Sequence, residues 1–187
     1  INETDRDWFP LMMAVATNNE EVVSLLLRNG AEVDKTDAAG LTSLALAVQE
    51  GHVKPMTMLL EHGADANHKS KYSTTPLCDA CLGGHVALVK LLLERGADIQ
   101  ARYCGETPLE IAKRRRCRAV VMLLEAHYKA KFPLHGAAKT GDVDAMTLLL
   151  DGGADVNRAM NDGRTPLSIA KSQGHAAVVD LLAQYTE

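Results

Sequence analysis

Residues 75–98 read TPLCDACLGGHVALVKLLLERGAD, and this stretch decides the fold. Thr75 can cap a helix that starts at Pro76, where the missing proline N–H costs nothing. Gly84 suits a tight turn with a positive φ, and the apolar residues that follow at helical spacing predict a second helix. Gly96 fits the left-handed position that ends such a helix. The stretch therefore predicts a helix–turn–helix unit.

The same pattern recurs along nearly the whole chain. Gly-Ala-Asp or a near relative follows a leucine-rich segment at Gly30, Gly63, Gly96 and Gly153. The middle residues of Thr-Pro-Leu and its looser copies stand at intervals of 33, 33, 32, 25 and 33, namely Pro10, Ser43, Pro76, Pro108, Pro133 and Pro166. Self-similarity at a period of this size is the signature of a repeat protein.

In its period and in its Thr-Pro-Leu, Gly-His and Gly-Ala-Asp strings, the chain resembles the ankyrin repeat. The resemblance implies an all-α solenoid of about six helix–turn–helix repeats with projecting β-hairpin loops. We expect one domain over residues 1–187, with repeats at approximately 7–36, 37–69, 70–101, 102–128, 129–157 and 158–187.

Composition narrows the function classes. The formal net charge of −4 gives no general attraction for nucleic acid, whose binding depends on phosphate neutralisation. No apolar run reaches the length of about 18 residues that a membrane helix needs, so we expect no direct membrane insertion. The four cysteines form no disulfide framework, which favours a reducing compartment. We expect the cytoplasm, with the nucleus as the alternative, and a monomer as an isolated domain.

The interval of 25 marks a break in the pattern. No Gly-Ala-Asp string follows Leu124, so the finger after repeat four is predicted to be missing. One interpretation is drift in a loop that binds nothing. The other is a notch that admits a partner, lined by His127, Tyr128 and Lys131. Three smaller departures are Asn18 and Arg116, which replace the glycine between helices, and Ser73, which replaces a glycine at a hairpin tip.

Candidate chemistry is sparse. Cys78 and Cys81 form a single C-x-x-C, which packing inside the repeat explains better than a metal or redox site. His52, His85 and His175 are copies of one repeat position, and no Ser/His/Asp group stands outside the repeat register. We therefore predict no enzyme activity, no cofactor and no metal.

Ankyrin proteins generally bind ligands through hairpin tips and the exposed face of the first helices, which line a concave groove. The resemblance maps this surface onto hairpin tips and first helices of repeats two to six. From these positions, and with Arg102 as a flanking cation, we predict ten partner-binding residues, which we call the finger surface: Leu41, Gln49, Glu50, Lys71, Tyr72, Leu82, Arg102, Tyr103, Arg114 and Arg115. Tyr128 is added from the notch hypothesis. Aromatic and arginine side chains dominate interface hot spots. We expect a protein or peptide ligand with acidic character.

Residues 113–118 are the densest charged run, KRRRCR. A solvated turn, a partner-facing basic patch and a nuclear-import signal remain three interpretations of it. Asn67 and Asn157 occupy the hairpin position that asparaginyl hydroxylases modify in ankyrin proteins. A turn residue that bonds its own backbone is the simpler interpretation of both.

Two functions fit the sequence. The first is a protein–protein interaction scaffold. The second is an intramolecular regulatory domain of a larger enzyme, ubiquitin ligase or ion channel. The identity of the partner does not follow from the sequence, because the scaffold is shared and specificity depends on a few surface positions.

Overall fold

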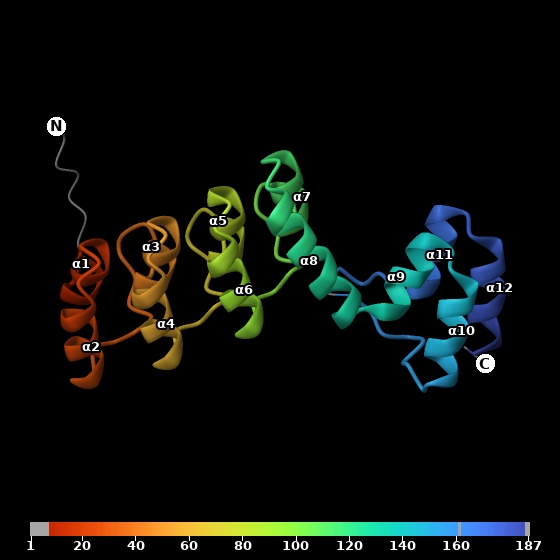
Figure 1. Ribbon diagram of the computed structural model, residues 1–187, viewed down its shortest axis with the longest axis horizontal. Helices are drawn as coiled ribbons and strands as arrows, with labels where there is room; N and C mark the ends of the chain where they lie inside the picture. The colour runs from red at the N-terminus through yellow and green to blue at the C-terminus, as the bar shows by residue number, and fades with distance from the viewer. Residues whose placement is uncertain (1–7, 161, 186–187) are drawn as a thin grey trace. The chain divides into compact units, whose positions relative to one another are not determined.

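The computed structural model describes residues 8–160 and 162–185, and within them it contains helices and loops without an extended strand. The helices follow one another in pairs (Figure 1). Their bounds are α1 Pro10–Ala16, α2 Glu20–Arg28, α3 Ser43–Gln49, α4 Val53–Glu61, α5 Pro76–Gly83, α6 Val86–Glu94, α7 Pro108–Arg114, α8 Arg118–Lys131, α9 Pro133–Thr140, α10 Val143–Asp151, α11 Pro166–Gln173 and α12 Ala176–Gln184. The predicted all-α ankyrin-type solenoid is confirmed.

The first helix of each pair begins as the sequence predicts. The threonine before α3, α5, α7 and α11 accepts a hydrogen bond from the backbone N–H three residues on, as Thr75 Oγ1 does from Cys78 N at 3.4 Å. At α7 the Glu110 carboxylate also accepts from Thr107 N, at 2.7 Å. These bonds satisfy N–H groups that the helix itself leaves without partners.

The residue between paired helices is left-handed in every pair. Four pairs use glycine, such as Gly84 at φ 69°, but Asn18 and Arg116 adopt the same region at 52° and 57°. Ser73 is left-handed too, at 59°. A side chain with a Cβ is strained in this region, least so for Asn. Asn18, Ser73 and Arg116 thus adopt the same left-handed backbone conformation as the glycines that they replace.

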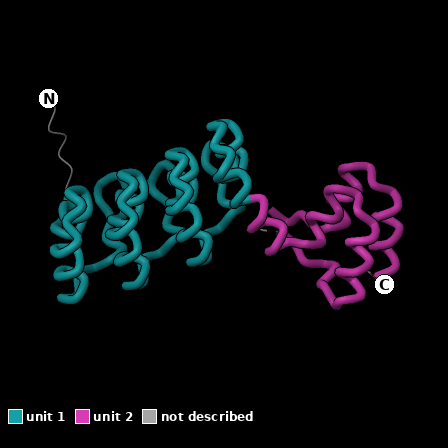
Figure 2. Tube along the Cα trace, viewed as in Figure 1, with its two compact units in different colours: residues 1–124 teal, residues 125–187 magenta. Residues whose placement is uncertain are grey.

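The chain divides into two compact units, Ile1–Leu124 and Glu125–Glu187, which are coloured separately in Figure 2. In the first unit α1, α3, α5 and α7 stack in one layer, while α2, α4 and α6 stack in a second. In the second unit α9 packs on α11 and α10 packs on α12. The expectation of a single domain over 1–187, and the repeat boundaries inside it, stay predictions; positions 7, 186 and 187 lie outside the described residues.

Apolar side chains between the stacked layers form the core. In the first unit the layer of first helices buries Leu44, Leu77 and Ile111 completely. The layer of second helices buries Leu59 and Leu92 completely. Burial of each such side chain contributes about 1.5–3 kcal/mol. Each repeat is therefore stabilised mainly by its neighbours, as in other solenoids.

The missing finger is confirmed as a structural feature. Helix α8 has 14 residues, whereas the other second helices have nine. It ends at Lys131, and α9 begins at Pro133, so Phe132 alone separates them. Elsewhere in the first unit the connection carries a hairpin, marked by the bridges Thr36–Thr42 and Tyr103–Glu106.

Candidate functional site

All ten residues of the finger surface lie in the first unit, on α3, α5 and α7, at the ends of these helices, or on the hairpins before them. Seven are exposed, among them Glu50, the C-cap residue of α3, while Leu41, Leu82 and Tyr103 are partly buried. Since α3, α5 and α7 stack in one layer, the structure brings these positions onto one series of neighbouring elements.

Tyr72 is the most exposed aromatic residue of this surface, at 74%. It stands at the tip of the third hairpin, where Ser73 at φ 59° reverses the chain and Ser73 N donates to Ser70 O at 2.9 Å. The hairpin is tied to its neighbour because Lys71 N donates to Ala39 O at 3.1 Å. A large ring is thus held in solvent on a loop with fixed backbone.

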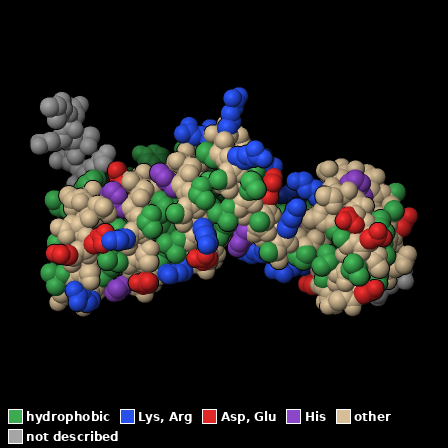
Figure 3. Space-filling model, in the orientation of Figure 1, with side chains coloured by type: hydrophobic (Ala, Val, Ile, Leu, Met, Phe, Trp, Pro, Cys, Tyr) green, Lys and Arg blue, Asp and Glu red, His purple; other side chains and the backbone are tan. Residues whose placement is uncertain are grey.

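The basic end of the surface is formed by α7 and the turn after it. Figure 3 shows Lys and Arg side chains gathered over α7, and Lys113, Arg114, Arg115, Arg116 and Arg118 are all exposed. The Arg114 guanidinium pairs with Glu106 at 2.9 Å, and this partner raises its pKa. Arg115 Nε donates to Leu82 O at 3.0 Å, which joins the turn to α5.

The other two cations of the finger surface also have backbone partners. Lys71 Nζ donates to Ala38 O, and Arg102 Nη1 donates to Gly105 O at 2.6 Å. The contact with Ala38 O fixes the position of the Lys71 charge without neutralising it, because a carbonyl oxygen carries no net charge.

Asp79 is a residue that the sequence interpretation missed. It lies on α5, is half-buried, and accepts two hydrogen bonds, from Thr74 Oγ1 at 2.7 Å and from Gln49 Nε2 at 3.0 Å. Burial raises the pKa of the carboxyl, and the two hydrogen bonds oppose that shift. The repeat register could have identified it, because the equivalent positions of the other repeats carry apolar residues or glycine: Met13, Leu46, Ile111, Gly136 and Ile169.

Tyr103 lies within electrostatic reach of Asp79. The pKa of its phenol is raised first by the neighbouring Cys104 and further by Asp79, while Arg114 lowers it. The charges of Asp79 in repeat three and Arg114 in repeat four therefore both act on the Tyr103 phenol, in opposite directions.

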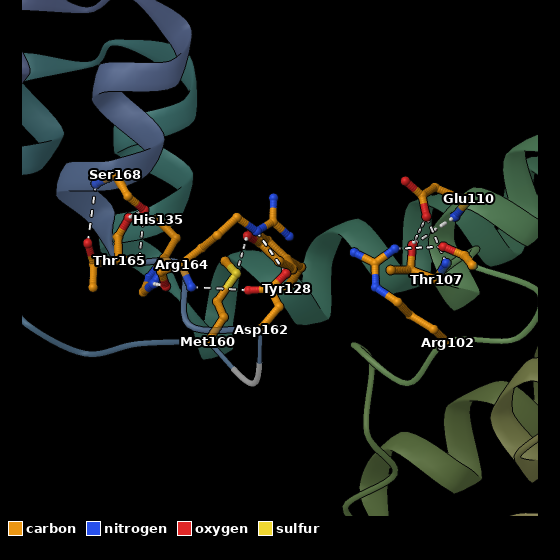
Figure 4. A network of polar contacts seen from close by, with 11 residues as sticks. Arg102, Thr107, Glu110, Tyr128, His135, Met160, Asp162, Arg164, Thr165 and Ser168 are labelled. Carbon is orange, nitrogen blue, oxygen red and sulfur yellow. Dashed lines mark hydrogen bonds and ion pairs between the residues drawn. The ribbon is translucent and has the colours of Figure 1, made fainter. Parts of the chain in front are cut away.

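Tyr128 lies in the second unit, so its place relative to the finger surface is not defined. Its hydroxyl lies 3.6 Å from Met160 Sδ (Figure 4). Its ring centroid lies 5.5 Å from that of Phe132. Phe132 in turn makes an edge contact with His135, whose Nε2 is 3.3 Å from Arg164 O. The contacts assign Tyr128 a packing role in this unit, and its partner contact stays a prediction.

The two asparagines differ. Asn67 Oδ1 accepts from Asp98 N at 2.7 Å and its Nδ2 donates to Gly96 O at 3.3 Å, so its amide joins two repeats. Asn157 N donates to Asp155 Oδ1 at 3.0 Å, a local bond that Asn67 N also makes, with Asp65 Oδ1 at 2.8 Å. Hydroxylation of either residue stays a prediction.

The cysteines fit the packing interpretation. Cys78 and Cys81 are fully buried, and burial raises the pKa of Cys81 to about 12. A thiolate, which metal binding and redox exchange require, is disfavoured there. Among the described residues no group of three or more His, Cys, Asp or Glu side chains is placed to hold a metal ion. No helix in the described ranges has the length and apolar character to cross a membrane.

Comparison with known proteins agrees with this architecture. The chain is similar to ankyrin repeat protein FPV223 of fowlpox virus, with 34% identity over 42% of this chain and 60% of that protein. It is also similar to the ARF GTPase-activating protein Git of Drosophila melanogaster, with 41% identity over 29% of this chain and 7% of that protein. A third similar protein is glycerophosphocholine phosphodiesterase gde1 of Schizosaccharomyces pombe, with 47% identity over 24% of this chain and 4% of that protein.

The chain thus spans less than two thirds of each of these relatives. Models of the ankyrin repeat family match residues 1–70 and 120–187 as three-copy ankyrin repeats, and residues 59–112 as many-copy ankyrin repeats. Ankyrin repeats are generally protein-interaction modules, and proteins of this family are typically not catalytic. The chain belongs to the ankyrin-repeat family.

Proposed function

We propose that this chain is a protein-interaction module that binds a peptide segment of a partner protein at the finger surface. One observation carries the proposal: Tyr72, an aromatic ring with 74% of its surface exposed, held at a hairpin tip whose backbone is fixed. A soluble protein gains nothing in stability from such a ring, whereas a partner can bury it. Aromatic side chains of this kind are typical hot spots of interfaces.

The charges next to Tyr72 suggest the chemistry of the ligand. Lys71, Arg102, Arg114 and Arg115 flank Tyr72 and Tyr103 along the finger surface, and Arg114 pairs with the carboxylate of Glu106. Acidic residues of a peptide would be attracted to this basic surface and steered toward it. We propose that the ligand carries acidic residues, that the isolated chain is monomeric and non-catalytic, and that it acts in the cytoplasm, with the nucleus as the alternative.

An intramolecular role is the second candidate. The matched segment is 7% of the ARF GTPase-activating protein and 4% of the phosphodiesterase, so a segment similar to this chain is a small part of each of these larger proteins. In a comparable setting the finger surface would bind a segment of the same polypeptide. Both candidates use the same residues, and they differ only in whether the bound segment comes from the same or from another chain.

Selection from a random linear peptide library displayed on phage tests the proposal. Immobilised wild-type chain is expected to enrich a family of related peptides, and the double variant Tyr72→Ala, Tyr103→Ala is expected to bind those peptides at least about tenfold more weakly. Tyr185→Ala is the matched control, because Tyr185 is exposed but lies on the second unit. Circular dichroism verifies that the variants fold. Equal binding by the folded double variant would contradict the proposal.

A further inference from the structure

Asp79 occupies a repeat position that otherwise serves packing. The position faces the preceding repeat: Leu46 is 3% exposed beneath α1, whereas Met13, with no described repeat before it, is 55% exposed. Ile111 is fully buried at the same position of repeat four. An apolar side chain would therefore serve the stack better than a carboxylate, which loses hydration when it is buried.

Two donors accompany the carboxylate, and neither has a polar counterpart beside Leu46. Thr74 donates to Oδ1 and Gln49 to Oδ2, at 2.7 and 3.0 Å. The positions that correspond to these donors around Leu46 hold Leu41 of repeat two and Ala16 of repeat one, which have no polar side-chain atom. Asp79 thus has a dedicated hydrogen-bond environment, and the three polar residues form one arrangement rather than a single isolated substitution.

The arrangement holds the carboxylate in place but leaves it incompletely compensated. A carboxylate has about four acceptor sites, of which the two hydrogen bonds use half. Burial still raises its pKa despite both bonds. The pKa of Tyr103 is affected by both Asp79 and Arg114. The Arg114 guanidinium pairs with Glu106, at 2.9 Å. The carboxylate is oriented, half-buried and still able to accept bonds from a cation.

We propose that Asp79 is a specificity residue that receives one lysine or arginine side chain of the bound peptide. The proposal rests on the proposed function, because it assigns this contact to the same finger surface. Gln49 and Thr74 are positioning residues that orient the carboxylate. Leu82, one helical turn after Asp79 on α5 and partly buried, supplies apolar surface near it. A matching ligand therefore has a basic residue for Asp79 next to acidic residues for Arg114 and Arg115.

The peptides enriched by the wild-type chain provide the test. They are expected to share Lys or Arg at one fixed position, and replacing that residue with norleucine should weaken binding to the wild-type chain at least about tenfold. Asp79→Asn keeps the size of the side chain and removes the charge. It should lose affinity for the basic peptide by a similar factor and should bind the basic and norleucine peptides equally well.

Asp144→Asn is the matched control, since Asp144 is exposed in the first turn of α10 and the charge change is the same. It should retain the preference for the basic peptide. Enriched peptides without a shared basic residue, or an Asp79→Asn variant that still prefers lysine to norleucine, would overturn the assignment of Asp79 and leave the binding surface intact. Enrichment of no peptide at all would overturn the proposed function, and this inference with it.

Discussion

Repeats two and three share one backbone, yet they treat the same packing position in opposite ways. Repeat two places Leu46 there, nearly fully buried, between Leu41 and Ala16 at the neighbouring positions. Repeat three places Asp79 there, with Thr74 and Gln49 as its donors. The difference indicates that repeat two is built for stability and that repeat three gives up part of its stability to hold a charge.

The largest effect is expected when the charge is moved into repeat two. Leu46→Asp removes a buried side chain and leaves a carboxylate without donors, because Leu41 and Ala16 cannot bond to it. We expect a loss of at least about 4 kcal/mol in the free energy of unfolding, measured by urea denaturation. A loss below about 1 kcal/mol would show that the position tolerates charge in any repeat.

Removal of one donor in repeat three comes next. Thr74→Val keeps the shape of the buried threonine and removes the 2.7 Å bond to Asp79. We expect a loss of about 1–2 kcal/mol in stability and a further rise of the Asp79 pKa, since this bond is one of the two that lower it. Urea denaturation and NMR titration of the Asp79 carboxyl measure the two changes. An unchanged pKa would mean that Thr74 does not support the charge.

The turn after each first helix allows a smaller test of the same comparison. Repeat three has Gly84 and repeat four has Arg116, both left-handed. Arg116→Gly should raise the free energy of unfolding by about 0.5–1 kcal/mol, because it removes the strain of a Cβ in this region. Arg118→Gly, at the first residue of α8 and outside the left-handed region, removes the same side chain without relieving strain; it serves as the control and should not raise stability. A lower free energy of unfolding for Arg116→Gly would show that the left-handed conformation of Arg116 is not strained.

The smallest expected effect is a pH dependence. Since the pKa of Asp79 is raised in the folded chain, the ionised carboxylate disfavours folding, and this unfavourable contribution grows as the pH rises through the folded pKa. Asp79→Asn should therefore be more stable than the wild-type chain at neutral pH. Its advantage should disappear as the pH falls below the ordinary Asp pKa of about 3.9. Thermal unfolding of both proteins between acid and neutral pH measures this difference.

Much of the fold was predictable because its signals are local and repeated. Thr-Pro-Leu predicts the helix starts, the glycines predict the left-handed turns, and the short interval before Pro133 predicts the missing finger. The division into two units was not predicted, since no composition change marks Leu124. It depends on which helices pack together, and that is a property of the whole chain.

The candidate site was predicted less well. The positions of Tyr72 and Arg115 follow from the repeat register, but the contacts Arg114–Glu106 and Arg115–Leu82 join residues whose side-chain directions the sequence does not give. The expectation that Tyr128 lines a notch stays a prediction, and its contacts with Met160 and Phe132 do not follow from the sequence. No role was predicted for Asp79 from the sequence, although the equivalent positions of the other repeats carry no charged residue and thus set it apart.

The stability of a single variant tests the central claim, that repeat three carries a charge for binding at the expense of packing. Asp79→Leu gives repeat three the residue type of repeat two, and the free energy of unfolding of the full chain is measured in urea at neutral pH. A rise of about 1 kcal/mol is predicted, because an apolar side chain replaces an incompletely compensated carboxylate. A fall would show that Asp79 stabilises the stack through Thr74 and Gln49 and would contradict the account.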